Sequence, residues 1–411
     1  MMNLQQFVNQ VTTKPKTITK LSANLFIQKG FGLVELMVGL VIGLLATLVI
    51  MQVFAVFEGQ KRTTTGTSDA QTSGSVALYS LQRDVQLAGF GLPLYDRNNM
   101  PLTCIAPNVS PDIVLADGTA GADGVTDVDH DGDLGTPNIN MSPIDIIDGG
   151  NLPGATDTLI VRYGTTASGG VPVRVTGIAA APTLAVDTNM GCQNNDVVYA
   201  VTGSDCRATR VNDPALAMNP TQITVADATG IVGGIAPTSL ACLGAWNEFA
   251  FRVDLAASQL VRRVNAVDTP MVEGVVNLQA QYGISASRNS NRITQWVDAT
   301  GVWATPPVNA AVVACGAALA DRNCIKAVRV AVVSRNDLIE KPVVSTACSS
   351  TTAANPTGVC AWDATSADPL GVGWAAPVVD LSNTANWDRY RYRVYETIIP
   401  LRNMVWTRSR L

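Results

Sequence analysis

The stretch KGFGLVEL, residues 29–36, opens an apolar run that continues to Phe57 and carries no charge after Glu35. As a helix, residues 36–57 would be about 33 Å long, which matches the roughly 30 Å hydrocarbon thickness of a bilayer. The run is too long for a secretory signal peptide, whose apolar core spans about 7–15 residues. We therefore predict a membrane-spanning helix. A plain single-pass anchor would explain its length but not Glu35, because a carboxylate near the bilayer centre costs roughly 2.5–3.5 kcal/mol.

The start of this run carries a resemblance to a known family. A basic leader ends in Gly30, Phe31 follows, Glu35 is the fifth residue after the glycine, and a long apolar helix comes next. This arrangement resembles the class III leader of type IV pilins and pseudopilins. In that family a prepilin peptidase cuts after the glycine, methylates the new N-terminal amine and leaves the span in place. The resemblance implies that residues 1–30 are a removed leader, that Phe31 begins the mature chain and that Glu35 serves assembly by meeting the amine of an adjacent subunit.

Charge and apolar spacing predict the arrangement on either side of the span. Residues 1–30 hold four lysines and no acidic residue. By the positive-inside rule this end stays in the cytoplasm and the remainder is exported, so we expect a single-pass inner-membrane protein with a periplasmic head. We assign residues 31–57 to the transmembrane half of the helix and residues 58–92 to its soluble half. The soluble half shows an apolar face at helical spacing, formed by Leu78, Leu81, Val85 and Ala88.

The residue pattern and composition change after the predicted helix. Residues 93–411 contain short runs of period two separated by long stretches rich in Gly, Ala, Thr, Asp and Pro. Candidate strands lie at residues 158–163, 249–254, 259–264 and 272–282, and near Val328. We predict an α+β fold, in which a largely antiparallel β-sheet head with long loops packs on the soluble half of the helix.

Two segments of the head indicate more closely which group of pilins the chain resembles. They are MVEGVVNLQ at residues 271–279, followed by Tyr282, and YRYRVYET at residues 390–397, followed by PLRN at residues 400–403. Both are similar to the PilW family of minor pilins in type IV pilus assembly, and type II secretion pseudopilin J shares the first. The resemblance implies a minor pilin without catalytic activity that takes part in starting or assembling a pilus. Its expected partners are other minor pilins, the pilus assembly machinery, prepilin peptidase and the inner membrane. The alternatives are a type II secretion pseudopilin and a membrane-anchored periplasmic binding protein or adhesin.

Composition argues against several other functions. The net charge of −5 argues against a nucleic-acid partner, which normally requires a basic patch. The chain has one histidine, His130, so any catalytic triad would have to use it. His130 lies in an Asp/Gly-rich loop that is typical of a solvated or binding segment, and we expect neither an enzyme nor a small-molecule substrate.

That loop is the one stretch that suggests a cofactor. Its carboxylates alternate as in the D-x-D-x-D-G opening of a calcium loop, at Asp127, Asp129, Asp131 and Asp133. The twelfth position holds Asn138 instead of the usual Glu, and Pro137 blocks a normal exit helix. A calcium site and a plain solvated acidic loop both remain open, and no other cofactor is expected.

Eight cysteines, all beyond the span, predict disulfide bonds in an exported head. Short loops are easily closed, so we predict three local pairs and one long-range pair. The predicted pairs are Cys192–Cys206, Cys315–Cys324, Cys348–Cys360 and Cys104–Cys242.

Overall fold

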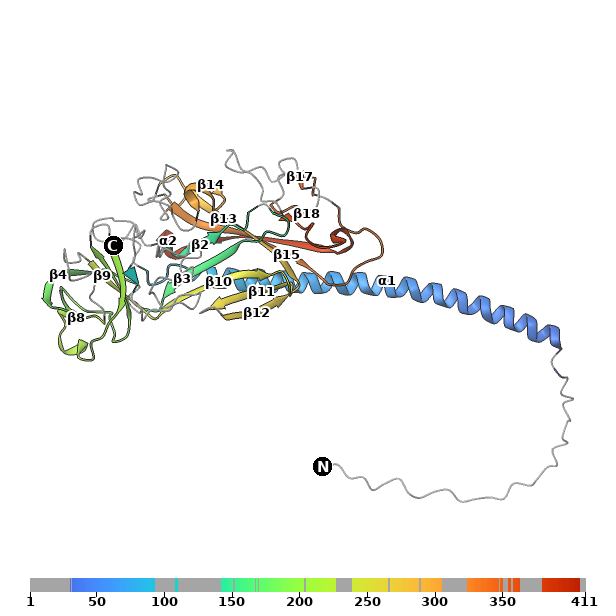
Figure 1. The fold of residues 1–411 in the computed structure, drawn as a ribbon, viewed down its shortest axis with the longest axis horizontal. Coiled ribbons are helices and arrows are strands. Elements are labelled where there is room, and N and C mark those ends of the chain that lie inside the picture. Colours follow the sequence, from blue (N-terminus) through green and yellow to red (C-terminus); the bar gives the residue numbers. More distant parts are fainter. Residues whose placement is uncertain are drawn as a thin grey trace, which may run out of the picture. The chain divides into compact units, whose positions relative to one another are not determined.

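The structure is a computed structural model of the chain. The residues that it describes are 30, 32–92, 108–109, 142–150, 152–166, 168, 170–202, 205–226, 239–264, 267–287, 290–304, 324–346, 348–349, 354–355, 358–362 and 379–406. The chain forms two units, Met1–Gln60 and Lys61–Leu411. Figure 1 shows the long helix α1, Leu33–Val85, and the strands of the second unit.

Helix α1 runs without interruption through the threonine-rich tract. The hydroxyl groups of Thr67, Thr72 and Ser75 donate hydrogen bonds to backbone carbonyl oxygens four residues earlier, at 2.8–3.0 Å. These side chains are therefore satisfied within the helix and do not break it. After Val85 the backbone turns, and Gly89 and Gly91 adopt positive φ angles of 78° and 72°, which favour glycine.

The second unit contains an antiparallel four-stranded sheet, which we call the helix-facing sheet because α1 packs on one of its faces. Its strand order is β14-β13-β15-β20. The bounds are β13 Val275–Ser285, β14 Ile293–Val297, β15 Ile325–Arg335 and β20 Tyr392–Pro400, and the short helix α2, Arg402–Trp406, follows β20.

An antiparallel five-stranded sheet shares the core with the helix-facing sheet. Its order is β12-β11-β10-β3-β2. The bounds are β2 Ile144–Ile147, β3 Thr158–Gly164, β10 Trp246–Asp254, β11 Gln259–Val264 and β12 Val267–Glu273. The predicted strand at 158–163 and the predicted hairpin of 249–254 with 259–264 are confirmed.

The predicted single strand over residues 272–282 is wrong in one respect. The chain is divided at Gly274, so that β12 ends at Glu273 and β13 begins at Val275. Gly274 has a φ of 77°, and a Cβ atom there would lie 2.6 Å from the carbonyl oxygen of Arg335. The glycine therefore allows the chain to pass from one sheet to the other, and period-two spacing gave no sign of this change.

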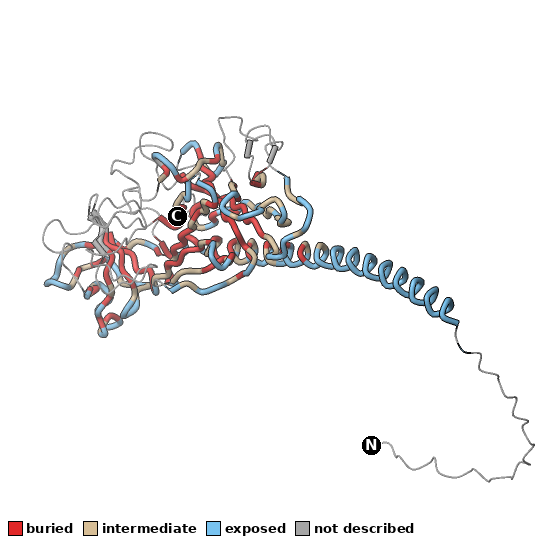
Figure 2. Tube along the Cα trace, turned by 45° about the vertical axis from the view of Figure 1, so that its right-hand side comes forward, coloured by how far each residue is buried: buried red, intermediate tan, exposed pale blue. Residues whose placement is uncertain are grey.

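Helix α1, the five-stranded sheet and the helix-facing sheet share one hydrophobic core. Leu81 and Val85 of α1 pack with Phe249 of the five-stranded sheet and Val330 of the helix-facing sheet. The tube in Figure 2 shows these strands as largely buried. Tyr282 joins the two sheets, because its hydroxyl oxygen accepts a hydrogen bond of 2.6 Å from the backbone N–H of Ile146. The α+β prediction is confirmed, with the head divided among several sheets.

A seven-stranded sheet of order β1-β7-β6-β9-β4-β5-β8 has a hydrophobic core of its own, and residues of β6, β7 and β9, such as Tyr199 and Leu243, also belong to the main core. Its bounds are β1 Asn108–Val109, β4 Val173–Ala180, β5 Thr183–Val186, β6 Val197–Thr202, β7 Asp205–Arg210, β8 Gln222–Thr224 and β9 Ser239–Gly244, with the 3-10 helix η1 at Leu216–Met218. Of these strands, all except β1 lie within residues 165–245, the segment of chain between the end of β3 and the start of β10. Gly164 and Trp246 are directly paired, so this segment is an insertion into the five-stranded sheet.

The outer face of the helix-facing sheet, opposite α1, is also covered. The pair β18 Gly358–Val359 and β19 Val379–Asp380 packs there together with Trp362. Strand β13 is consequently buried along its whole length, including its alternating polar side chains Asn277, Gln279 and Gln281. The other short elements are β16 Cys348–Ser349, β17 Ala354–Asn355, η2 Gly301–Trp303 and η4 Trp387–Arg389.

Candidate functional site

The predicted processing site lies at the start of α1. Gly30 is exposed and Phe31 lies outside the described residues. Glu35 is exposed in the first turn of the helix. A negative side chain is favoured there, because the backbone N–H groups of the first turn give the helix N-terminus a partial positive charge. The sequence order thus places the carboxylate beside the amine that cleavage after Gly30 would create.

The first unit contributes the apolar half of α1. Residues 33–60 are all exposed, and Figure 2 shows these turns in pale blue. In the described part of the chain, α1 is the one helix long and apolar enough to cross a membrane. Exposed turns of leucine, valine and isoleucine are costly in water and favourable in lipid. This half of α1 is therefore a candidate membrane anchor.

The second half of α1 packs on the head through small residues. We call Gly66, Ala70, Gly74 and Ala77 the small-residue seam; all four are buried and they recur every three or four positions along one helix face. A Cβ atom at Gly74 would lie 2.2 Å from Cδ2 of Tyr395, on β20. The absence of a side chain at Gly74 therefore lets the tyrosine ring lie against the helix backbone.

Polar contacts fix the helix against the sheet. The hydroxyl of Ser334 donates a hydrogen bond of 2.7 Å to the carbonyl oxygen of Ala70, and Nδ2 of Asn336 donates one of 2.8 Å to Asp69. Beyond the helix end, Nδ2 of Asn403 donates a hydrogen bond of 2.9 Å to the carbonyl oxygen of Ala88. Residues of β15, of the loop after it and of α2 thus hold the helix at both ends of its packed half.

A buried ion cluster lies in the five-stranded sheet. Arg162 on β3 donates through Nε to Glu248 at 2.9 Å, and its Nη1 lies against Asp145 on β2. Burial by itself lowers the pKa of Arg162, but the charges of Glu248 and Asp145 and their hydrogen bonds raise it above its ordinary value. Arg162 is therefore charged, and the cluster ties three adjacent strands together.

A second buried carboxylate joins the two sheets of the core. Asp157 accepts hydrogen bonds from the backbone N–H groups of Gly149, at 3.0 Å, and of Ala280 on β13, at 2.7 Å. Burial raises the pKa of Asp157 to about 7, while these two hydrogen bonds act to lower it and the charge of Asp148 adds to the rise. A group whose pKa lies near neutrality therefore lies at the contact between the loop before β3 and strand β13.

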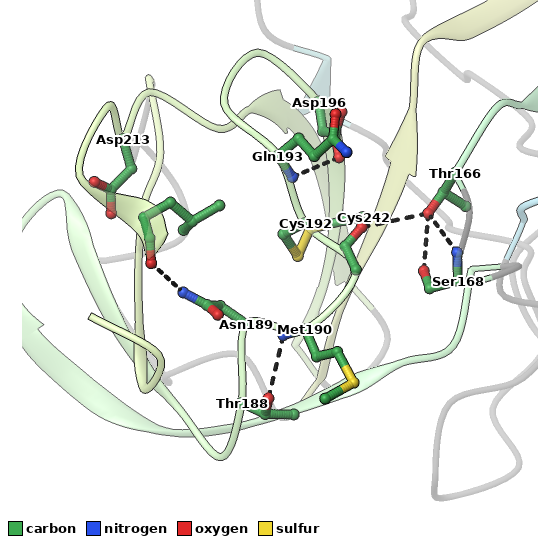
Figure 3. Close-up of a disulfide and its surroundings, with 12 residues drawn as sticks. Thr166, Ser168, Thr188, Asn189, Met190, Cys192, Gln193, Asp196, Asp213 and Cys242 are labelled. Carbon is green, nitrogen blue, oxygen red and sulfur yellow. Dashed lines mark hydrogen bonds between the residues drawn. A yellow bond between two sulfur atoms is a disulfide. The ribbon is translucent and has the colours of Figure 1, made fainter. Parts of the chain in front are cut away.

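The disulfide of the seven-stranded sheet corrects two predicted pairs. Cys192 is bonded to Cys242, with a Cα–Cα distance of 5.3 Å (Figure 3). The predicted pairs Cys192–Cys206 and Cys104–Cys242 are therefore wrong. Strand pairing gives the reason: β9 lies on one side of β6, with Cys242 opposite Val198, whereas Cys206 lies in β7 on the other side. Loop length favoured the local pair, and the order of strands in the sheet brought a more distant cysteine closer.

The other disulfide predictions stay untested. Cys324 and Cys360 are disulfide-bonded. Their predicted partners are Cys315 and Cys348; Cys315 lies outside the described residues, as does the side chain of Cys348.

The predicted calcium loop falls outside the described residues. Asp127, Asp129, Asp131 and Asp133 all belong to that part of the chain, as does His130. Within the described ranges, no group of three or more His, Cys, Asp or Glu side chains is placed to hold a metal ion.

Comparison with known families bears on the helix-facing sheet. The model of type IV pilus-assembly protein W, PilW, matches residues 252–403. This part of the chain is similar to the PilW family. The match runs from the end of β10 into α2 and includes Ser334, Asn336 and Tyr395, which contact α1, whereas the whole inserted segment 165–245 lies before it. No curated protein and no solved structure matched the chain in the corresponding searches.

Several residues of this arrangement were not predicted from the sequence. The small-residue seam lies in the polar tract, where a four-residue spacing of Gly and Ala was the available signal. The Arg162 cluster gave no local signal, because Asp145 and Glu248 come from distant parts of the chain.

Proposed function

We propose that the chain is a minor pilin of type IV pilus assembly. The observation that carries the proposal is the PilW match over residues 252–403. Its strands pack on a helix whose first half is a candidate membrane span. The function is structural: the head presents a surface to other minor pilins while the apolar half of α1 anchors the chain.

The processing steps follow from the same proposal. Prepilin peptidase removes residues 1–30 and methylates the amine of Phe31, and the chain enters the inner membrane with its N-terminus in the cytoplasm and its head in the periplasm. The exposed Glu35 then forms an ion pair with the amine of a neighbouring subunit. Because such a pair is costly to desolvate, its value lies more in aligning the neighbouring helix than in net stability.

A deletion strain complemented with variants tests the proposal. We expect loss of the chain to reduce the number of surface pili, and wild-type chain to restore it and to co-purify with other minor pilins. Glu35→Ala should leave membrane insertion and leader cleavage largely intact while lowering cross-linking to partner pilins and pilus number, and Glu35→Asp should restore part of both. Normal piliation without the chain would contradict an assembly role, and normal cross-linking of Glu35→Ala at wild-type protein level would contradict the role of Glu35.

A further inference from the structure

Residues 336–345, which follow β15, form a loop with exposed apolar side chains, which we call the post-β15 loop (Figure 1). Leu338, Ile339 and Val343 are 44%, 43% and 59% exposed. Single exposed apolar side chains are common on protein surfaces, but three within six residues of one loop form a patch. Lys341 is exposed between them.

Hydrogen bonds fix this loop in place. The backbone N–H of Glu340 donates to the carbonyl oxygen of Arg389 at 2.9 Å, and that of Val344 donates to Asp388 at 2.8 Å. The carboxylate of Glu340 is bound by Arg391 through Nε at 2.5 Å and Nη2 at 3.2 Å. The exposed side chains of the loop are therefore presented on a supported backbone.

The loop lies beside the first turns of α1 in the second unit. The hydroxyl of Thr63 is 3.4 Å from Oε1 of Glu340, and Asn336 contacts Asp69. Thr63 comes six positions after Phe57, the end of the apolar run, and six residues of chain reach at most about 20 Å. Chain connectivity alone therefore keeps the loop close to the membrane surface.

The local charge is opposite in sign to that of the whole chain. Residues 61–69, 336–345 and 388–393 hold six cations and four carboxylates, whereas the chain has a net charge of −5. The cations are Lys61, Arg62, Lys341, Arg389, Arg391 and Arg393, and the carboxylates are Asp69, Asp337, Glu340 and Asp388. Three of the carboxylates have partners within the protein, Glu340 with Arg391, Asp337 with Arg335 and Asp69 with Asn336. Arg391 is one of the six cations, so its pair with Glu340 adds no net charge, and the excess of two cations comes from the other residues. Apolar side chains beside cations are the combination that binds the interface of an anionic bilayer.

We propose that the post-β15 loop docks the head on the headgroup layer of an anionic membrane. Leu338, Ile339 and Val343 enter the interface, and Lys341 and Arg389 meet the lipid phosphates. The contact is a second attachment besides the span, and it keeps the head at the bilayer surface until the subunit is extracted into a filament. The inference rests on the membrane anchor of the proposed function.

Hydrogen–deuterium exchange of the full-length chain in lipid nanodiscs, one copy per disc, tests the docking. One set of discs contains phosphatidylcholine alone and the other adds phosphatidylglycerol at a three-to-one ratio. We expect amides of residues 338–344 to exchange at least about fivefold more slowly in the anionic discs, since one interfacial cation contributes a factor of about five. High salt should remove most of the difference, because the Debye length falls to about 3 Å at 1 M.

Matched variants separate lipid docking from other causes. Leu338→Ser/Ile339→Ser/Val343→Ser and Lys341→Glu/Arg389→Glu should each abolish the slowing while leaving exchange in β15 unchanged. The control Met190→Ser/Met218→Ser removes two side chains that are 81% and 82% exposed in the inserted segment, and it should retain the slowing. Equal exchange in both kinds of disc, or slowing that persists in the triple-serine variant, would overturn the docking while leaving the anchor intact. Failure of the chain to enter discs would overturn the anchor and the docking together.

Discussion

The packing of the small-residue seam predicts that the same substitution, glycine to alanine, has opposite effects on stability at two positions of α1. Gly66 and Gly74 are both buried glycines of α1, and replacing either by alanine raises helix propensity by about 1 kcal/mol. Their surroundings differ. A Cβ atom at Gly66 would lie 3.5 Å from Cβ of Asn336, which is an ordinary contact, whereas at Gly74 it would lie 2.2 Å from Cδ2 of Tyr395 and 2.8 Å from Oγ of Ser334.

The magnitudes follow from these distances. Gly66→Ala should raise the free energy of unfolding by up to about 1 kcal/mol, because the propensity gain is not opposed. At Gly74 the ring must move away from the helix, which costs roughly 1–3 kcal/mol as overpacking. The same movement strains the hydrogen bond from Ser334 to Ala70, worth about 0.5–1.5 kcal/mol. We expect Gly74→Ala to lower the free energy of unfolding by about 1–3 kcal/mol in total.

Equilibrium unfolding of the full chain in detergent, combined with hydrogen exchange of residues 66–85 and of β20, measures both effects. Exchange in both segments should become faster in Gly74→Ala and no faster in Gly66→Ala. Removing the obstructing ring supplies the second test, because Gly74→Ala should destabilise a Tyr395→Ala background much less than it destabilises the unmodified chain, with only the Oγ of Ser334 still close to the added Cβ. If Gly74→Ala stabilises the unmodified chain as much as Gly66→Ala does, the seam is not packed as described.

Three further predictions concern the head. Asp157 has a pKa of about 7 in the folded protein and an ordinary pKa of 3.8, so the folded state binds the extra proton, and the free energy of unfolding should fall by up to about 4 kcal/mol as the pH rises from 4 to 7. Urea unfolding should show that the stability of Asp157→Asn depends less on pH than that of the unmodified chain. An equal pH dependence in the two proteins would contradict this. Non-reducing peptide mapping should find Cys192 linked to Cys242, and a free thiol at either would refute the bridge. Calorimetry of the chain with its acidic loop should show calcium binding that is abolished by Asp129→Ala/Asp131→Ala, and equal heats would leave the loop as plain acidic surface.

Local patterns predicted the helix and several strands. A long apolar run has few alternatives to a membrane helix, and β3 together with the hairpin of β10 and β11 shows the period and length of ordinary strands. The outer face of β13 was harder, because its alternating polar side chains, Asn277, Gln279 and Gln281, are typical of a solvent-facing side but are buried. The layer of β18, β19 and Trp362 packs on this side of the sheet.

The sequence could not predict which segments far apart in the chain pair with each other. Gly164 and Trp246 are neighbours across β3 and β10, yet 81 residues lie between them, and no local signal marks the two ends of an insertion. The Cys192–Cys242 bond depends on the same arrangement, since it requires β9 to lie beside β6. Glu35 and Gly30 are different, because a leader is recognised as a linear sequence and its motif is therefore visible without a fold.

The proposed role in pilus assembly depends most on whether the chain is processed and assembled as a pilin. Mass spectrometry of its N-terminus, in matched strains with and without prepilin peptidase, tests this directly. With the peptidase we predict a mature chain that begins at Phe31 with one methyl group on its amine, and without it a chain that retains residues 1–30. An unprocessed N-terminus at Met1 in the strain that contains the peptidase would contradict the assignment of this chain as a pilin.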